Sequence, residues 1–189
     1  MERGATAHHE AGHAVVAMRM GLKFKRVTIL ASPEEGSLGY VLGASEPLWF
    51  RPDVELTRRV QKRIKRKIIA GFAGQHAEAK FRGRNPRWGM DSDNQAAVDL
   101  AFYVCSPVTV NAYLRDCWHT SRDVVSESWC DIQTVATSLL VSETLNQNEV
   151  IKLITSGRSA LRARGAKRDE RTPGGSPKVR KTPAAQDGR

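Results

Sequence analysis

The chain has 189 residues and a formal net charge of +10 at pH 7, with 40% hydrophobic and 26% charged residues. These values are ordinary for a single globular domain with a hydrophobic core, and the length excludes two full-sized domains. No run approaches the roughly 18–20 apolar residues of a membrane-spanning helix, and residues 1–7 lack the apolar core of a secretory signal. Three widely spaced cysteines indicate reduced thiols rather than a disulfide framework. We therefore expect a cytoplasmic protein without a membrane span.

The first predicted element is a helix over residues 6–20, which contains the metal motif His9-Glu10-Ala11-Gly12-His13. This HExxH spacing places both imidazoles on one helix face, where they can reach a single zinc ion. Glu10 would lie beside the metal and could take a proton from zinc-bound water, whose pKa the metal lowers to about 7. Inward-facing histidines without a metal would each need another buried partner. The motif therefore predicts a zinc site rather than two core or surface histidines.

A β-hairpin is predicted next, from the short runs at 26–31 and 37–42 on either side of a Pro/Gly turn at 32–36. Glu34 and Glu35 lie in this turn. A thermolysin-like site takes its third zinc ligand from a downstream glutamate. Because neither residue lies on a packed second helix, both are poor candidates for that ligand.

A long amphipathic helix is predicted over about 53–80, since apolar residues recur there at helical spacing. Its opposite face carries a basic run at 58–67, with seven Lys/Arg in ten residues. Such a run is either a solvated surface or a contact for an anionic partner, which could be nucleic acid, an acidic protein or phospholipid. Charge alone does not choose among these partners.

The third zinc ligand is sought in the next helix, which Asp91 or Ser92 is predicted to cap. Asp93 shares the inner stripe of that helix with apolar residues, so its carboxylate either caps the helix N-terminus or binds a cation. A catalytic zinc needs three protein ligands and an open position, and Asp93 is the best candidate for the third. The metzincin pattern HExxHxxGxxH is excluded, because Val16 is the third residue after the motif and no histidine follows.

The rest of the chain is predicted to contain a helix from Pro107 to about 145 with a break near Trp129, then a short helix at 149–155. Residues 157–189 carry ten Lys/Arg against three Asp/Glu and are rich in Gly, Pro and Ser. They cannot bury enough apolar surface to offset their chain entropy. We therefore predict a mainly α domain over 1–156, a helical array with a small two-stranded β-ribbon, followed by a disordered basic tail.

Five segments, in the same order along the chain, resemble the protease domain of the FtsH family, the membrane-anchored AAA+ zinc metalloproteases. They are residues 9–16, 25–29 with 37–40, 70–78, 91–101 and 139–150. The resemblance implies a zinc metalloendopeptidase that holds Zn²⁺ with His9, His13 and Asp93 and uses Glu10 as the general base. It also implies that an extended substrate adds along the edge strand at 37–42, which assigns Leu38, Gly39 and Tyr40 to substrate binding. Glu78 falls in the family's Gly-Gly-x-x-Ala-Glu helix, either beside the zinc site or in buried helix pairing.

The sequence also departs from the family's pattern. The family carries an ATPase module and transmembrane helices before its protease domain, but this chain has no GxxxxGK[ST] motif and no apolar span. Ala79 stands where the family has a second glutamate, and Gln75-His76 are unusual. We expect stand-alone activity to be limited to unfolded or flexible polypeptides, with a separate ATPase or unfoldase as the candidate partner.

Two other functions are compatible with the sequence. One is a catalytically silent, FtsH-protease-like binding module whose zinc is structural. The intact Glu10 argues against it, since a structural zinc site needs no base and is usually closed by a fourth ligand. The other is nucleic-acid binding through the basic tail and residues 58–67. The sequence leaves the oligomeric state open.

Overall fold

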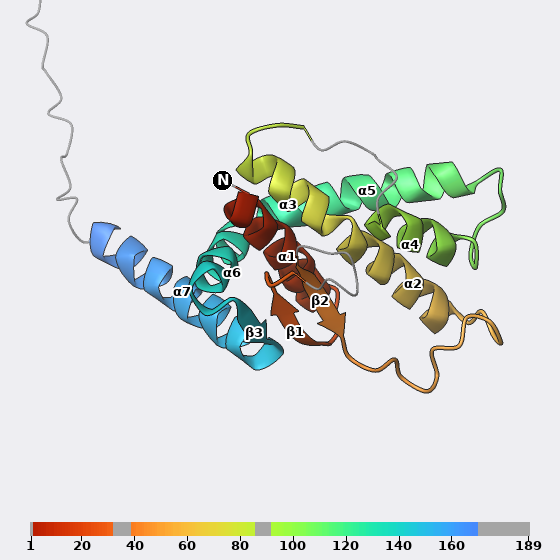
Figure 1. The fold of residues 1–189 in the computed structure, drawn as a ribbon, viewed down its shortest axis with the longest axis horizontal. Coiled ribbons are helices and arrows are strands. Elements are labelled where there is room, and N and C mark those ends of the chain that lie inside the picture. Colours follow the sequence, from red (N-terminus) through yellow and green to blue (C-terminus); the bar gives the residue numbers. More distant parts are fainter. Residues whose placement is uncertain (1, 32–38, 86–91, 170–189) are drawn as a thin grey trace, which may run out of the picture. The chain divides into compact units, whose positions relative to one another are not determined.

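The computed structural model describes the backbone of residues 2–31, 39–85 and 92–169, and the side chains of these residues except at 92–93 and 160–169. The elements in chain order are α1 (Glu2–Arg19), β1 (Phe24–Thr28), β2 (Tyr40–Gly43), α2 (Arg58–Gly71), α3 (Ala73–Phe81), α4 (Ser92–Ala101), α5 (Val110–Glu127), α6 (Trp129–Ser142), β3 (Thr144–Asn146) and α7 (Gln147–Asp169) (Figure 1). The mainly helical class predicted from the sequence is confirmed.

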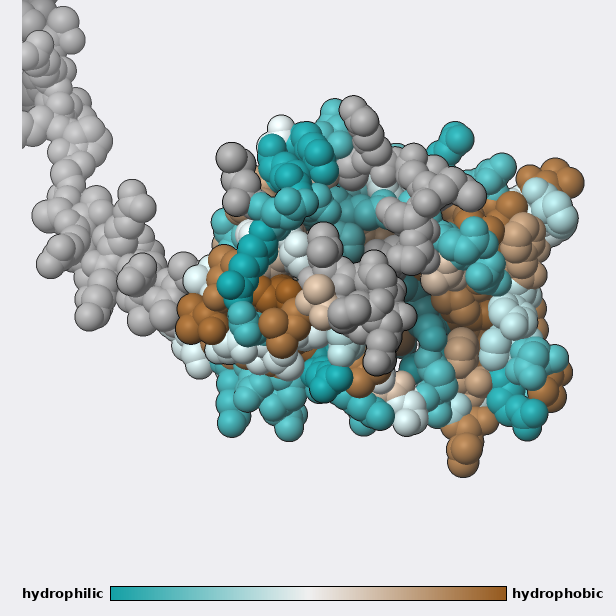
Figure 2. Space-filling view, viewed as in Figure 1, coloured by the Kyte–Doolittle hydropathy of each residue, from teal (hydrophilic) through white to brown (hydrophobic). Residues whose placement is uncertain are grey.

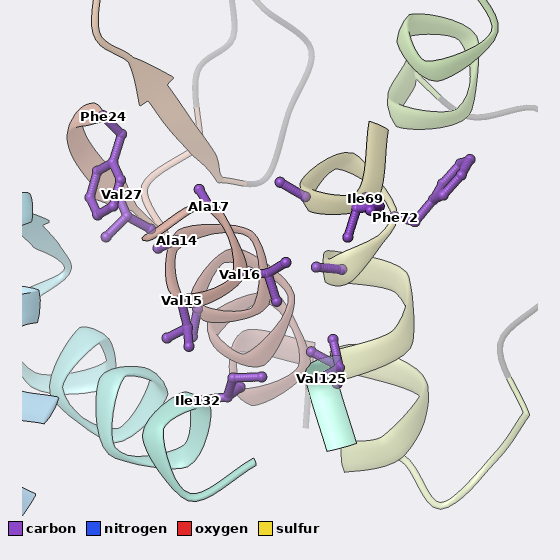
Figure 3. Close-up of a cluster of buried hydrophobic side chains, with 14 of the residues drawn as sticks. Ala14, Val15, Val16, Ala17, Phe24, Val27, Ile69, Phe72, Val125 and Ile132 are labelled. Carbon is purple, nitrogen blue, oxygen red and sulfur yellow. The ribbon is translucent and has the colours of Figure 1, made fainter. Parts of the chain in front are cut away.

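Helix α1 forms the centre of the domain and packs against α3 and α6. It is buried on most of its faces because it consists largely of small residues. In Figure 3, Val15 points toward Ile132 of α6, whereas Val16 points to a different side of the helix, toward Ile69. A Cβ at Gly12 would lie 2.7 Å from both the carbonyl oxygen of Ala73 and the Cβ of Ala77. The glycine therefore permits the close approach of α3 to α1.

A three-stranded antiparallel sheet in the order β2-β1-β3 lies beside these helices, so the prediction of a two-stranded ribbon was wrong. The additional strand forms because Glu143, the C-cap of α6, has a left-handed φ of 59°, which turns the chain back toward β1. The carbonyl oxygen of Glu143 then accepts hydrogen bonds from the Ile29 amide (2.9 Å) and the Thr28 hydroxyl (3.1 Å). A strand of only three residues is too short to be predicted from the sequence pattern.

The single helix predicted over 53–80 is two helices, with a break at Phe72. Phe72 is fully buried against the Trp118 ring, with the ring centroids 5.2 Å apart. Helix α2 begins after Thr57, whose hydroxyl accepts a hydrogen bond from the Val60 amide as an N-cap. The predicted break near Trp129 is confirmed, because α5 and α6 meet at Ser128.

The chain divides into two compact units, residues 1–157 and 158–189. Helix α7 continues to Asp169, so the first part of the segment predicted to be disordered is helical. Its Ala, Leu and Arg residues favour helix, and they continue a helix that has already started. None of the helices in the described ranges combines the length and apolar character needed to cross a bilayer.

Candidate metal centre

His9 and His13 point from α1 toward a common position. Their Nε2 atoms are 3.0 Å apart, and the two rings meet edge to face at 74°. Zinc binds imidazole nitrogen at about 2.0–2.1 Å, so one ion can contact both atoms at this separation. Both residues are partly buried rather than enclosed. The helical spacing of the motif therefore produces the pair of donors that the sequence predicts.

The other nitrogen of each ring has an oxygen partner on a neighbouring helix. His13 Nδ1 lies 2.8 Å from the carbonyl oxygen of Ala70 on α2, and His9 Nδ1 lies 3.3 Å from Oε2 of Glu78 on α3. Carbonyl and carboxylate oxygens can only accept, so both Nδ1 atoms donate. In neutral rings this leaves a lone pair on each Nε2. Two lone pairs at 3.0 Å repel each other unless a proton or a metal cation lies between them.

Glu78 is a charged partner for His9. Its other oxygen, Oε1, accepts hydrogen bonds from Arg82 (2.7 Å) and Arg84 (3.2 Å). The hydrogen bond from His9 is the largest cause that lowers the pKa of Glu78 to about 2; the hydrogen bond and charge of Arg82 act in the same direction, and burial opposes them. Glu78 is therefore ionised throughout the neutral range and orients the His9 ring. The sequence left two positions open for Glu78, beside the zinc site or in buried helix pairing. In the structure it lies beside the candidate site.

Gly74 is a residue of the centre that the sequence analysis missed. A Cβ at this position would lie 2.6 Å from both Cδ2 and Nε2 of His9, and it would also collide with Nε2 of His13. The backbone of α3 thus forms one wall of the space in front of the two Nε2 atoms. The only available signal was a glycine inside a helix, which is unfavourable unless close packing requires it.

Glu10 lies on the buried side of α1 and is only 5% exposed. A Cβ built on Gly39 would lie 2.9 Å from Cγ and 3.1 Å from Oε1 of Glu10. The same Cβ would lie 2.8 Å from the carbonyl oxygen of Thr28. The carboxylate predicted to be the general base is therefore in contact range of the residue that precedes β2.

Strand β2 lies at one edge of the sheet, because the strand order is β2-β1-β3. Of the three residues predicted to bind substrate, Gly39 adjoins Glu10 and Tyr40 begins β2. The Tyr40 hydroxyl accepts a hydrogen bond of 2.8 Å from Arg26 on β1. Leu38 lies outside the described residues.

The third metal ligand cannot be placed by its side chain. Asp93 is the second residue of α4, a helix that packs against α2, but its side chain lies outside the described set, as do Glu34 and Glu35 altogether. Among the side chains that the structure describes, no group of three or more His, Cys, Asp or Glu residues is arranged to hold a metal ion. The described part of the centre is thus a two-histidine pair with its supporting residues.

No protein-family model and no curated protein sequence matches this chain.

Two other histidines, on α1 and α3, pack against aromatic rings and contact backbone carbonyl oxygens. His8 stacks on Phe81, with the ring centroids 4.0 Å apart, and its Nδ1 lies 2.7 Å from the carbonyl oxygen of Gly4. His76 lies against the ring of Trp118 and donates from Nε2 to that residue's carbonyl oxygen at 3.0 Å. Burial lowers the pKa of His76 to about 4, so its ring is neutral at pH 7.

Proposed function

We propose that this protein is a zinc-dependent endopeptidase that cleaves unfolded or flexible polypeptides. The observation that carries the proposal is the facing pair of Nε2 atoms on His9 and His13, whose Nδ1 atoms are both committed to oxygen acceptors. Any side chain at Gly74 would collide with both Nε2 atoms, so glycine is required at this position beside the pair. The donor chemistry of the pair therefore fits a zinc ion, and Asp93 completes the proposed set of three protein ligands.

In this proposal the bound zinc ion supplies a Lewis acid that polarises the scissile carbonyl and acidifies water. His9 and His13 hold the ion through neutral Nε2 atoms, and Glu78 keeps His9 in the required tautomer. Glu10 accepts a proton from the attacking water as the water oxygen bonds to the carbonyl carbon. Glu10 then delivers that proton to the departing amine nitrogen as the C–N bond breaks.

The position of β2 supports an extended polypeptide as the substrate. An edge strand offers unpaired backbone groups to a second chain, and such pairing is tolerant of the side chains it binds. Gly39 brings this edge next to Glu10. A folded substrate must be unfolded before it can pair in this way, so we propose a separate ATPase or unfoldase as a partner and a cytoplasmic location for the reaction.

The first test is the metal content of the purified chain by mass spectrometry. We expect about one zinc ion per chain, lost in His13→Ala and in Asp93→Ala. His119→Ala is the matched control, because His119 is an exposed histidine on α5. Retention of zinc in Asp93→Ala would reject Asp93 as a ligand and redirect the search to Glu34 or Glu35.

The second test is cleavage of a fluorescently labelled unfolded protein by the zinc-loaded chain, with and without a chelator. Glu10→Gln should retain zinc and lose cleavage, whereas Glu127→Gln, at an exposed position on α5, should retain both. Equal proteolysis by Glu10→Gln and wild type would reject the assignment of the base. Zinc binding by a wild-type chain that cleaves nothing would support the silent binding module instead.

A further inference from the structure

The outward face of α2 carries a row of four cations. Arg58, Arg59, Lys62 and Arg66 recur at positions opposite the buried Val60, Ile64 and Ile68, and all four are exposed. Within the described parts of the chain, none of the four has an acidic partner in an ion pair. The row is therefore a concentrated positive charge facing solvent.

The other cations of the helix are neutralised within the fold. Arg63 and Lys67 both bind Glu46, at 2.8 Å and 2.5 Å, and Lys65 binds Asp116 on α5 at 2.8 Å. These pairs use the acidic side chains along the flanks of α2. The fold thus separates the basic run at 58–67 into paired flanking residues and the outward row.

The loop between β2 and α2, residues 44–57, presents apolar side chains beside this row. Leu48 is 96% exposed and Val54 is 63% exposed, and Figure 2 shows apolar residues protruding at the end of the molecule where this loop lies. The guanidinium of Arg59 lies 3.8 Å from the centre of the Trp49 ring. This stacking holds the apolar loop against the first turn of α2.

Exposed aliphatic side chains next to unpaired cations favour a lipid surface over nucleic acid. A nucleic acid would gain from a free aromatic face on which bases could stack, but Arg59 already covers Trp49. Leu48 and Val54 would gain little from a sugar-phosphate backbone. At a bilayer these aliphatic residues can enter the acyl boundary.

We infer that the outward cations of α2 and the apolar residues of the 44–57 loop form a docking surface for an anionic phospholipid membrane. The cations bind the headgroups by electrostatic attraction, and Leu48 and Val54 add apolar burial. The loop also contains Asp53 and Glu55, but residues 44–67 together hold eight basic and only three acidic side chains. This surface uses no residue of the candidate metal centre, so the inference stands independently of the proposed peptidase activity.

The test is cosedimentation of the full chain with vesicles of phosphatidylcholine alone and of phosphatidylcholine containing about 30% phosphatidylserine. We expect binding only to the anionic vesicles, weakened by salt. Arg58→Gln/Lys62→Gln/Arg66→Gln should lower the partition coefficient about 100-fold, since each cation near the surface contributes about fivefold. Arg59 is left in place because it stacks on Trp49.

The matched control is Arg162→Gln/Arg164→Gln/Lys167→Gln, which removes the same charge from the basic segment after Gly157. It should weaken vesicle binding much less than the α2 variant does. An equal or larger loss in this control would overturn the inference, because binding would then follow total charge or the C-terminal segment. Circular dichroism of both variants checks that the helical content is unchanged.

Leu48→Ser distinguishes a membrane from any other anionic partner. We expect it to weaken binding to the anionic vesicles about tenfold, because a leucine side chain is lost from apolar burial, and to leave retention on immobilised duplex DNA unchanged. Unchanged vesicle binding by Leu48→Ser would overturn the inference. Tighter binding of wild type to duplex DNA than to the vesicles would instead assign the surface to nucleic acid.

Discussion

The backbone of Gly74 lies so close to the imidazole of His9 that even a methyl group at this position would lie 2.6 Å from His9 Nε2. A helix rarely carries a glycine in its interior without a reason, since glycine costs about 1 kcal/mol relative to alanine. Here any side chain would collide with the Nε2 atoms of both imidazoles. This relationship connects the packing of α3 on α1 to the chemistry of the candidate metal centre.

Gly74→Ala should abolish zinc binding and cleavage without unfolding the protein, because the new methyl group would occupy the space in front of the Nε2 atoms. Zinc content and proteolysis are the measurements. Gly71→Ala is the matched control: a Cβ at Gly71 meets no atom within 4 Å, so this change should leave zinc binding intact and raise the free energy of unfolding by about 0.5–1 kcal/mol. Zinc binding by Gly74→Ala at wild-type affinity would place the ion elsewhere.

Glu78→Gln should weaken zinc binding by about 10–100-fold, because an amide is a poorer acceptor for His9 Nδ1–H and makes the ring a weaker ligand. The affinity is measured by competition with a chromogenic chelator. Glu127→Gln, which removes a carboxylate at an exposed position, should not change the affinity. If the two variants bind zinc equally well, Glu78 has no role in orienting His9.

His76 should make the fold less stable in mild acid. Its pKa in the folded protein is about 4 because of burial, whereas the unfolded chain has the ordinary value of about 6.5. Between these two pH values the unfolded state binds more protons, so the free energy of unfolding falls as the pH drops from 6.5 toward 4. The contribution is at most about 3 kcal/mol.

Urea unfolding at pH 7 and pH 5 measures this effect. His76→Gln should flatten the difference between the two pH values, because glutamine does not titrate, even if it lowers stability at pH 7. His119→Gln should reduce the difference much less, because the charge of His119 contributes less than burial to the low pKa of His76. An unchanged pH dependence in His76→Gln would mean that other groups cause the loss of stability.

Glu143→Gly should stabilise the protein by about 0.5–1 kcal/mol, because residue 143 has a left-handed φ of 59° that glycine adopts without strain. Thermal unfolding is the measurement. Glu143→Ala removes the same exposed ion pair with Arg3 but keeps the strain, so alanine should be neutral or slightly destabilising. A glycine variant no more stable than the alanine variant would show that the turn into β3 carries no strain.

The sequence by itself determined the local features of this protein. The HExxH spacing places two imidazoles on one face wherever that segment is helical, because the period of an α-helix is a property of the backbone. Apolar periodicity likewise predicted helix in the region of α2 and α3, although as a single helix, and the break near Trp129 was also predicted. The basic run at 58–67 was readable as the wet face of a helix for the same reason.

Tertiary structure alone decided what surrounds these features. Glu78 meets His9 across 69 residues of sequence, and Ala70 meets His13 across 57, so no local pattern could identify either pair. The break at Phe72 and the strand β3 depend on side chains and backbone groups of distant elements. The separation of the basic run into paired and outward cations was decided by Glu46 and Asp116. Contacts of this kind form only when distant segments pack together, because burial and charge pairing act through space and not along the chain.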